Sequence, residues 1–295
     1  MHIKSLVKLL APHGLYEYVR KSNHTLSDPI KNYYKNGRVP FSVGYLDAKN
    51  RYISDTLTNL CDFSSLEQLP FDYGHSFDER VVEYPWIFSE LNHLKKETFL
   101  DVGPCLNYDF LLDKLLKDTS IEKITFLSLT PDKNCFYSQR VSYVLEDVRS
   151  LTFIDNCFDV ITCISTIEHI GMDNSKYNAT KESSLEDYKI AISQMKRVLK
   201  PGGSLLLTVP FGKYENFGWF QQFDQAMVEE SINVFSPSKF FVSYYQYVSS
   251  GWITSDVASC SSSRYNPSLG YRQTHNFEPG KAVCASAIAC ISLTK

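Results

Sequence analysis

The 295-residue sequence predicts a single doubly wound α/β domain with a mostly parallel sheet, preceded by an N-terminal extension. Two observations favour this fold class. From about residue 98 onward, short β-rich runs alternate with helical stretches, and these runs are almost continuously apolar, as in strands buried on both faces. The chain is also 43% hydrophobic and 14% aromatic, which is enough for a substantial core.

Residues 1–70 are expected to form the extension, with a short helix and small strands. Residues 5–20 place apolar and basic residues at helical spacing, but Pro12 and Gly14 interrupt the pattern. Residues 39–57 suggest two short strands around a turn at Asp47 to Asn50. The first 38 residues hold seven lysines and arginines against two acidic residues, so this segment could contact a membrane surface or an acidic partner. A solvated charged face is the simpler alternative.

Residues 71–295 are expected to form the main domain. Its strands are predicted at residues 96–103, 122–129, 141–147, 158–166, 202–210, 239–248 and 284–293. The last two could close the sheet as an antiparallel hairpin with a long insertion between them. The clearest helix is predicted over residues 185–199, with Ser184 and Asp187 as a capping box at its start and Pro201-Gly202-Gly203 at its end.

The first candidate site is a glycine turn after the first predicted strand. The strand runs into Asp101-Val-Gly103-Pro-Cys105-Leu-Asn107 ahead of a helix. At such a turn, backbone N–H groups can meet a nucleotide-like cofactor. The segment resembles the first motif of class I S-adenosylmethionine (SAM) dependent methyltransferases, an acidic residue followed by alternating glycines. Cys105 and Asn107 replace the second and third glycines.

Later segments resemble the same family in order and spacing, over residues 98–212. Asp147, with Val148 beside it, resembles the acidic residue that meets the adenine amine, and Phe158-Asp159-Val160 opens the fourth strand. The run from Met195 to Leu207 resembles the signature helix and turn before the fifth strand. The resemblance implies a Rossmann-like seven-stranded sheet, SAM as cofactor, and a further cofactor contact at Ser165.

One position departs from the family pattern. The acidic residue that accepts both ribose hydroxyls at the end of the second strand is replaced by Ser128, which can make one of those hydrogen bonds but supplies no charge. Asp132 lies four residues further on and could reach the ribose instead. The alternative is a degraded site, in a pseudoenzyme that keeps the fold as a binding or scaffolding module.

Glu168 and His169 follow the fourth predicted strand, at the edge of the sheet where open α/β folds bind ligands. A histidine there can take the proton of an acceptor hydroxyl, and this run resembles the corresponding segment of small-molecule O-methyltransferases and cyclopropane fatty acid synthases. Asp173 and Tyr177 in the same loop are further candidates. The structural alternative is that His169 only packs against the loop or caps it.

The acceptor is expected to bind within residues 213–283. Aromatic side chains with amides and a carboxylate suit a sugar, although core packing explains the aromatic residues equally well. The candidates are Lys213, Trp219, Gln222 and Asp224, with Trp252, Arg264, Tyr265 and Arg272 as further contributors. From Phe77 onward the chain resembles a bacterial methyltransferase-like group associated with surface-polysaccharide biosynthesis. This resemblance implies O-methylation of a small-molecule or glycan acceptor and partners among biosynthetic enzymes.

Several classes of protein and site are not expected. The composition does not resemble that of a nucleic-acid-binding protein, and no set of histidines and carboxylates has metal-ligand spacing. The eight cysteines are scattered without a CxxC pair, so we interpret them as reduced thiols. No apolar stretch approaches the roughly 18 residues of a membrane span. We therefore expect a cytoplasmic protein, with peripheral contact to the inner face of the membrane as a further option.

Overall fold

The computed structural model describes residues 28–60, 62–175, 181–267, 278 and 280–295. The broken helix expected at residues 5–20 and the candidate residues Tyr177 and Arg272 lie outside the described residues.

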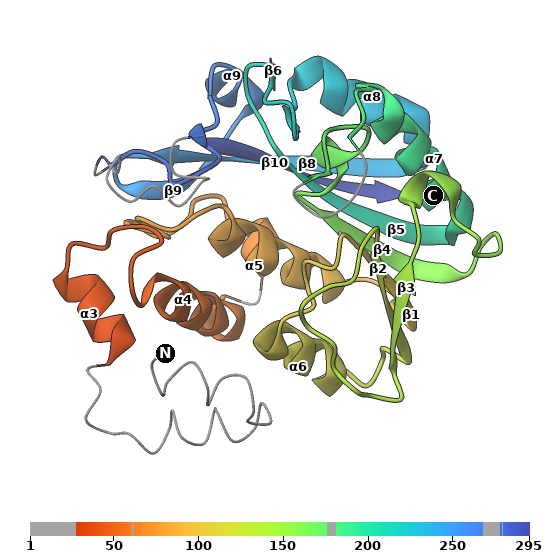
Figure 1. Cartoon of the computed structure of the whole chain (residues 1–295), viewed down its shortest axis with the longest axis horizontal. Coiled ribbons are helices and arrows are strands. Elements are labelled where there is room, and N and C mark those ends of the chain that lie inside the picture. The colour runs from red at the N-terminus through yellow and green to blue at the C-terminus, as the bar shows by residue number, and fades with distance from the viewer. Residues whose placement is uncertain (1–27, 61, 176–180, 268–277, 279) are drawn as a thin grey trace, which may run out of the picture.

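An eight-stranded sheet forms the centre of the molecule, in the order β3-β2-β1-β4-β5-β10-β8-β9 (Figure 1). The first five strands in this order are parallel, and β10, β8 and β9 pair antiparallel. The bounds are β1 (Thr98–Val102), β2 (Lys123–Ser128), β3 (Val141–Leu145), β4 (Phe158–Ile164), β5 (Leu199–Pro210), β8 (Lys239–Val248), β9 (Gly251–Ser255) and β10 (Ala287–Thr294). The predicted fold class and the antiparallel closing pair are confirmed.

The strand count is eight rather than the predicted seven. The additional strand, β9, forms a hairpin with β8, in which Gly251 pairs with Val248. A separate two-residue pair joins β6 (Glu215–Asn216) to β7 (Gln221–Gln222). The run GWITS is short and contains a glycine, so its sequence alone gives a weak strand signal.

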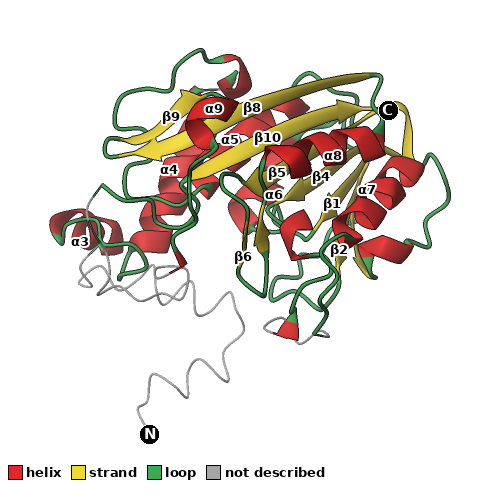
Figure 2. Ribbon diagram, turned by 90° about the horizontal axis from the view of Figure 1, so that it is seen from above, coloured by secondary structure: helices red, strands yellow, loops and turns green. Residues whose placement is uncertain are grey.

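Helices cover both faces of the sheet (Figures 1 and 2). Their bounds are α3 (Pro29–Lys35), α4 (Tyr45–Asn59), α5 (Arg80–Leu91), α6 (Asp109–Lys117), α7 (Asp187–Val198), α8 (Gln225–Phe235) and α9 (Val257–Cys260). Neighbouring residues of a strand point to opposite faces. Accordingly, Phe99 packs into the core beneath α3 to α6, whereas Leu100 packs into the core beneath α7 and α8.

The two small strands expected within residues 39–57 are wrong, because helix α4 occupies most of this segment. Tyr45, Ala48, Ile53 and Leu57 are buried, and their spacing of three to five residues places them on one helical face. They join Phe99 in one hydrophobic core, so the N-terminal helices complete the cover of the sheet. The division of the chain at residues 70 and 71 stays a prediction.

The predicted helix at residues 185–199 is observed as α7, but its start differs. The helix begins at Asp187, and the Ser184 hydroxyl donates to the Asp187 carboxylate at 2.5 Å instead of capping the first turn. The predicted capping box is therefore wrong: Glu186 is the N-cap residue, and the Asp187 carboxylate bonds Ser184 Oγ and Arg149 instead of a backbone N–H. The helix ends at Val198 and β5 begins at the next residue, so Gly202, with a φ of +76°, lies within β5 and not in a turn ahead of it.

Candidate functional site

A cleft opens at the carboxyl edge of the parallel strands, where the strand order reverses between β1 and β4. Open α/β sheets bind ligands at this switch point. The cleft holds about 600 Å³ of space, including solvent at its mouth. It is lined by Val102, Gly103, Leu127, Ser128, Leu129, Glu146, Asp147, Val148, Arg149, Thr166, Ile170, Gly171, Asn174 and Glu182. Of the predicted cofactor residues, the structure thus brings Gly103, Ser128, Asp147 and Val148 together.

The turn after β1 requires glycine at position 103. Gly103 has a φ of +82°, and a Cβ there would lie 2.2 Å from Thr166 Oγ1. The buried Asp101 carboxylate shapes this turn by accepting hydrogen bonds from Leu106 N at 2.8 Å and Thr162 Oγ1 at 2.7 Å. Burial raises the pKa of Asp101 to about 6. Asp101, a predicted cofactor residue, therefore fixes the conformation of the turn at the edge of the cleft but does not line the cleft.

The two residues that replace the expected glycines also anchor this turn. The Cys105 thiol donates to Ile164 O at 3.0 Å, which ties the turn to β4. The Asn107 amide donates to Asp132 Oδ2 at 2.8 Å and to Asn134 O at 2.9 Å. Cys105 thus bonds β4, Asn107 and Asp132 bond each other, and none of the three lines the cleft. Ser128 is the ribose-side candidate that lines it.

Asp147 lies at the far side of the cleft, where it caps a short 3-10 turn by accepting a hydrogen bond from Arg149 N. The Arg149 guanidinium also bonds both carboxylate oxygens of Asp147, and it pairs with Glu182 at 2.6 Å and Asp187 at 2.5 Å. Partial burial opposes ionisation, but the hydrogen bonds from Arg149 hold the pKa of Asp147 below its ordinary value. Asp147 is therefore an ionised acceptor at neutral pH.

The lining of the cleft fits a nucleoside. Apolar side chains, among them Leu127, Val148 and Ile170, can cover the faces of a flat ring. Asp147 Oδ1 accepts from Arg149 N and Nε, and Oδ2 accepts from Nε and Nη2, so an exocyclic amine can bond this carboxylate only by replacing one of these donors. The Ser128 hydroxyl lies along the same wall, where a ribose hydroxyl can reach it.

A buried polar group on α5 adjoins the cleft, and our sequence analysis missed it. Glu83 is fully buried, and its Oε1 accepts hydrogen bonds from Ser165 Oγ and Thr208 Oγ1, both at 2.6 Å. Its Oε2 accepts from Arg80 Nη1 at 2.5 Å. Ser165, predicted to contact the cofactor, therefore bonds Glu83 and holds an unusual φ of +37° next to Thr166. The available signal was an acid and a base three residues apart in the apolar run RVVEYPWIF.

The catalytic candidates Glu168 and His169 form a 3-10 turn after β4. His169 Nδ1 lies 2.8 Å from Trp219 O. Because a carbonyl oxygen only accepts, Nδ1 carries a proton, and the lone pair of a neutral ring is then on Nε2. Nε2 lies 4.0 Å from Glu168 Oε1. Burial raises the pKa of Glu168 well above its ordinary value.

Asp173, the third catalytic candidate, is held away from the cleft lining. Its carboxylate accepts from Ser175 Oγ at 2.6 Å and pairs with Lys181 at 3.4 Å. Hydrogen bonds from Ser175 lower the pKa of Asp173. This residue is therefore an ionised part of a surface loop.

The candidate acceptor residues separate into two groups. The Trp219 ring lies 5.0 Å from the His169 ring, beside an aromatic cluster that includes Phe220 and Tyr265. The others have structural contacts: Gln222 donates to Lys213 O and Ser263 O, Asp224 caps α8, Arg264 pairs with Glu215, and Trp252 is buried with its Nε1 donating to Phe77 O. Trp252 is thus a core residue, and the expectation that it completes an acceptor pocket is wrong.

Within the residues that the structure describes, no three histidine, cysteine, aspartate or glutamate side chains gather in a way that could hold a metal ion. Nor does any described helix have the length and apolar character needed to cross a membrane.

Comparison with known proteins identifies one matching family. Residues 118–207 match a family model described as a methyltransferase domain. No curated protein matches the sequence. The matched segment runs from the loop before β2 into β5 and makes up less than half of the chain.

Similar solved structures include three bacterial or archaeal proteins. A putative methyltransferase from Bacillus halodurans C-125 is 15% identical with a TM-score of 0.43, over 70% of this chain and 96% of that one. A SAM-dependent methyltransferase from Methanosarcina mazei is 14% identical with a TM-score of 0.39, over 69% and 96%. The 1,6-didemethyltoxoflavin-N1-methyltransferase of Burkholderia thailandensis, with its substrate and S-adenosylhomocysteine bound, is 13% identical with a TM-score of 0.43, over 97% and 91%.

Proposed function

We propose that the protein is a SAM-dependent O-methyltransferase that acts on a hydroxyl of a sugar or polysaccharide-related acceptor. The observation that carries the proposal is the cleft at the switch point of the sheet, along which Asp147, Ser128 and Gly103 lie in the order required by the parts of SAM. When bound, SAM supplies a methyl group on a positively charged sulfur.

Each part of the cofactor has a matching residue in the cleft. Asp147 accepts a hydrogen bond from the adenine amine, and Val148 packs against the ring. Ser128 bonds one ribose hydroxyl. The turn at Gly103 leaves room for the chain that carries the amino acid, since a side chain there would meet Thr166.

His169 acts as the general base. A hydroxyl is a poor nucleophile until its proton leaves, and His169 takes this proton at Nε2 while Trp219 O fixes the ring through Nδ1. The Trp219 ring lies 5.0 Å from the His169 ring, so an aromatic side chain of the kind found in sugar sites lies beside the base.

A second candidate is a pseudoenzyme that uses the fold as a binding or scaffolding module of a glycan biosynthesis complex. Two observations favour it: Ser128 supplies no charge to the ribose, and Arg149 already bonds both oxygens of Asp147.

Calorimetric titration with SAM and with S-adenosylhomocysteine separates the two candidates. The enzyme proposal requires binding of both ligands, and a protein that binds neither at millimolar concentration refutes it. A protein that binds both is then incubated with glycan acceptors, and the products are analysed by mass spectrometry. Methylation on nitrogen would contradict the O-methyltransferase assignment and leave the methyltransferase assignment standing.

A further inference from the structure

Arg80, the first residue of α5, presents an incompletely paired guanidinium close to the cleft. Its Nη1 donates to Glu83 at 2.5 Å, and its side chain is 23% exposed. Among the described residues, Nε and Nη2 of Arg80 have no hydrogen-bond partner, and neither atom is among the buried polar atoms that lack one. These two nitrogens therefore point into accessible space.

The contacts of Glu83 place this guanidinium at one end of the cleft. Glu83 bonds Ser165, and the next residue, Thr166, lines the cleft opposite Gly103. The charge of Arg80 also acts on Cys105 in the turn after β1 and on Glu168 in the turn after β4. Arg80 thus lies between the two turns that bound this end.

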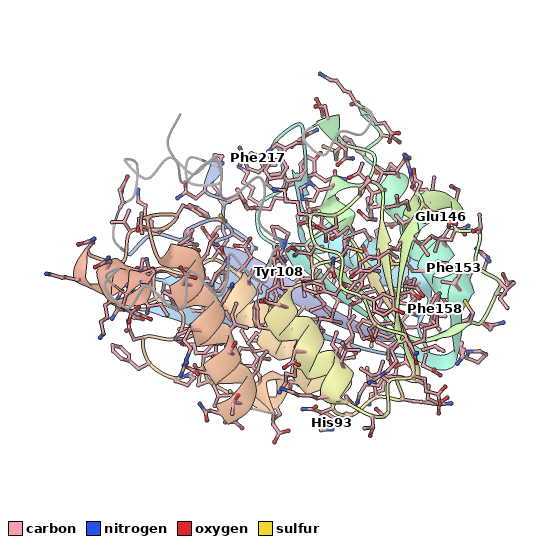
Figure 3. All side chains as sticks on the ribbon, turned by 60° about the horizontal axis from the view of Figure 1, so that its bottom comes forward. His93, Tyr108, Glu146, Phe153, Phe158 and Phe217 are labelled. Carbon is pink, nitrogen blue, oxygen red and sulfur yellow. The ribbon has the colours of Figure 1, made fainter. Side chains whose placement is uncertain are left out.

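Asp147 lies at the opposite end of the same cleft, beyond Ser128. In Figure 3, Glu146, the neighbour of Asp147, lies on the β3 side of the molecule, whereas Tyr108 in the turn after β1 lies toward its middle. A ligand with its adenine at Asp147 and its amino-acid end past Gly103 extends toward Thr166, whose neighbour Ser165 bonds Glu83, the partner of Arg80.

The free edge of the guanidinium is selective for one type of anion. Nε and Nη2 form a planar fork whose two N–H groups match the two oxygens of a carboxylate. Glu83 holds this fork in place through Nη1, and its own position is fixed by the hydroxyls of Ser165 and Thr208. Glu83 accepts from Nη1 alone, so the Nε and Nη2 edge is the part of the guanidinium left for a ligand carboxylate.

We propose that Arg80 binds the carboxylate at the amino-acid end of the S-adenosyl ligand, through the Nε and Nη2 edge that Glu83 leaves open. This inference rests on the proposed function, since it requires the ligand to lie in the cleft. It adds a binding residue from α5, outside the segment that matches the methyltransferase family model. An acceptor carboxylate has the same chemistry, and the experiment below separates the two sources.

The test compares two ligands that differ only in the carboxylate. S-adenosylhomocysteine and its decarboxylated analogue, S-adenosyl-3-thiopropylamine, are titrated calorimetrically into the wild-type chain and into Arg80→Met. The wild-type protein should bind S-adenosylhomocysteine about 10- to 100-fold more tightly than the analogue, as expected for a hydrogen-bonded ion pair. Arg80→Met should reduce this ratio to near one, because it weakens the binding of S-adenosylhomocysteine and leaves the binding of the analogue unchanged.

Two further variants make the result interpretable. Arg51→Met removes an exposed arginine on α4 that pairs with Asp55, and it should leave both affinities unchanged. Arg80→Lys keeps the charge but lacks the fork, so its ratio should fall between those of the wild type and Arg80→Met. If Arg80→Met does not fold, the ratio of the two ligand affinities in the wild type and in Arg80→Lys still tests the proposal.

The outcomes distinguish failure of the inference from failure of the proposed function. If the wild type binds both ligands equally, or if Arg80→Met binds S-adenosylhomocysteine like the wild type, the carboxylate assignment is refuted while the cofactor site stands. An unchanged ratio together with a loss of acceptor binding would show that Arg80 serves the acceptor. If the wild type binds neither ligand, the proposed function fails, and the inference fails with it.

Discussion

Replacing Glu79 by glutamine should change how the stability of the protein depends on pH. Glu79 precedes α5, is 9% exposed, and accepts a hydrogen bond from Ala285 N at 3.2 Å through Oε2. Burial, followed by the charges of Asp78 and Glu83, raises the pKa of Glu79 from 4.5 to about 7. A glutamine oxygen can keep the hydrogen bond from Ala285 without carrying a charge.

The sign and size of the effect follow from proton linkage. Because its pKa is raised on folding, Glu79 holds a proton in the native state over a range where the unfolded chain has lost it. The free energy of unfolding therefore falls as pH rises from about 4.5 to about 7, and the loss is complete above pH 7. At about 1.4 kcal/mol for each tenfold change in proton affinity, the loss is roughly 3 kcal/mol. Glu79→Gln removes this contribution.

Urea unfolding at pH 4.5 and at pH 8.5 measures the effect. The stability of Glu79→Gln relative to the wild type should improve by roughly 3 kcal/mol between the two pH values. Glu97→Gln makes the same chemical change on a side chain that is 47% exposed, and it should show a much smaller dependence. If the two glutamine variants behave alike, the burial of Glu79 does not raise its proton affinity, and the reasoning is refuted.

Three further predictions concern the cleft. Gly103→Ala should lower the free energy of unfolding by about 1 to 3 kcal/mol and weaken S-adenosyl ligands, because its Cβ meets Thr166 in a left-handed backbone; an unchanged melting temperature would contradict this. Asp147→Ala should weaken S-adenosylhomocysteine by about 1 to 3 kcal/mol while the protein stays folded, and unchanged affinity by calorimetry would exclude an adenine contact. His169→Gln should lower the methylation rate by roughly 10² to 10⁴ without a loss of SAM affinity, so nearly full activity would place the base elsewhere.

The sheet could be predicted from the sequence because its signals are local. A strand buried on both faces is mostly apolar, and β4 is buried along its whole length with Asp159 and Thr162 as its only polar residues. The turn at Gly103 is equally local, since its backbone conformation excludes other residues. Helix α4 is more difficult to predict, because the apolar and polar residues around Tyr45 and Ile53 also fit the alternating pattern of a strand. The helix buries these apolar residues together against the core, and this tertiary packing is not visible in the sequence.

The roles of the site residues depended on contacts between distant segments, which the sequence does not show. Asp101 and Asn107 belong to the first motif, yet both bond protein groups instead of lining the cleft. Trp252 is an aromatic residue of the kind common in sugar sites, but its side chain is buried in the core and its Nε1 donates to Phe77 O. Arg80 could not be placed because its position depends on Glu83 and on hydroxyls from two other strand ends.

The Glu83 contacts also constrain the order in which the protein can fold. Glu83 is 82 residues from Ser165 and 125 residues from Thr208, so these hydrogen bonds close very long loops. Such non-local pairings form slowly, because the chain loses the entropy of loop closure before the contacts stabilise it. During synthesis on the ribosome, α5 emerges well before β5, and until then its acid and base have no hydroxyl partners. We therefore expect the cleft to be among the last parts of the molecule to form.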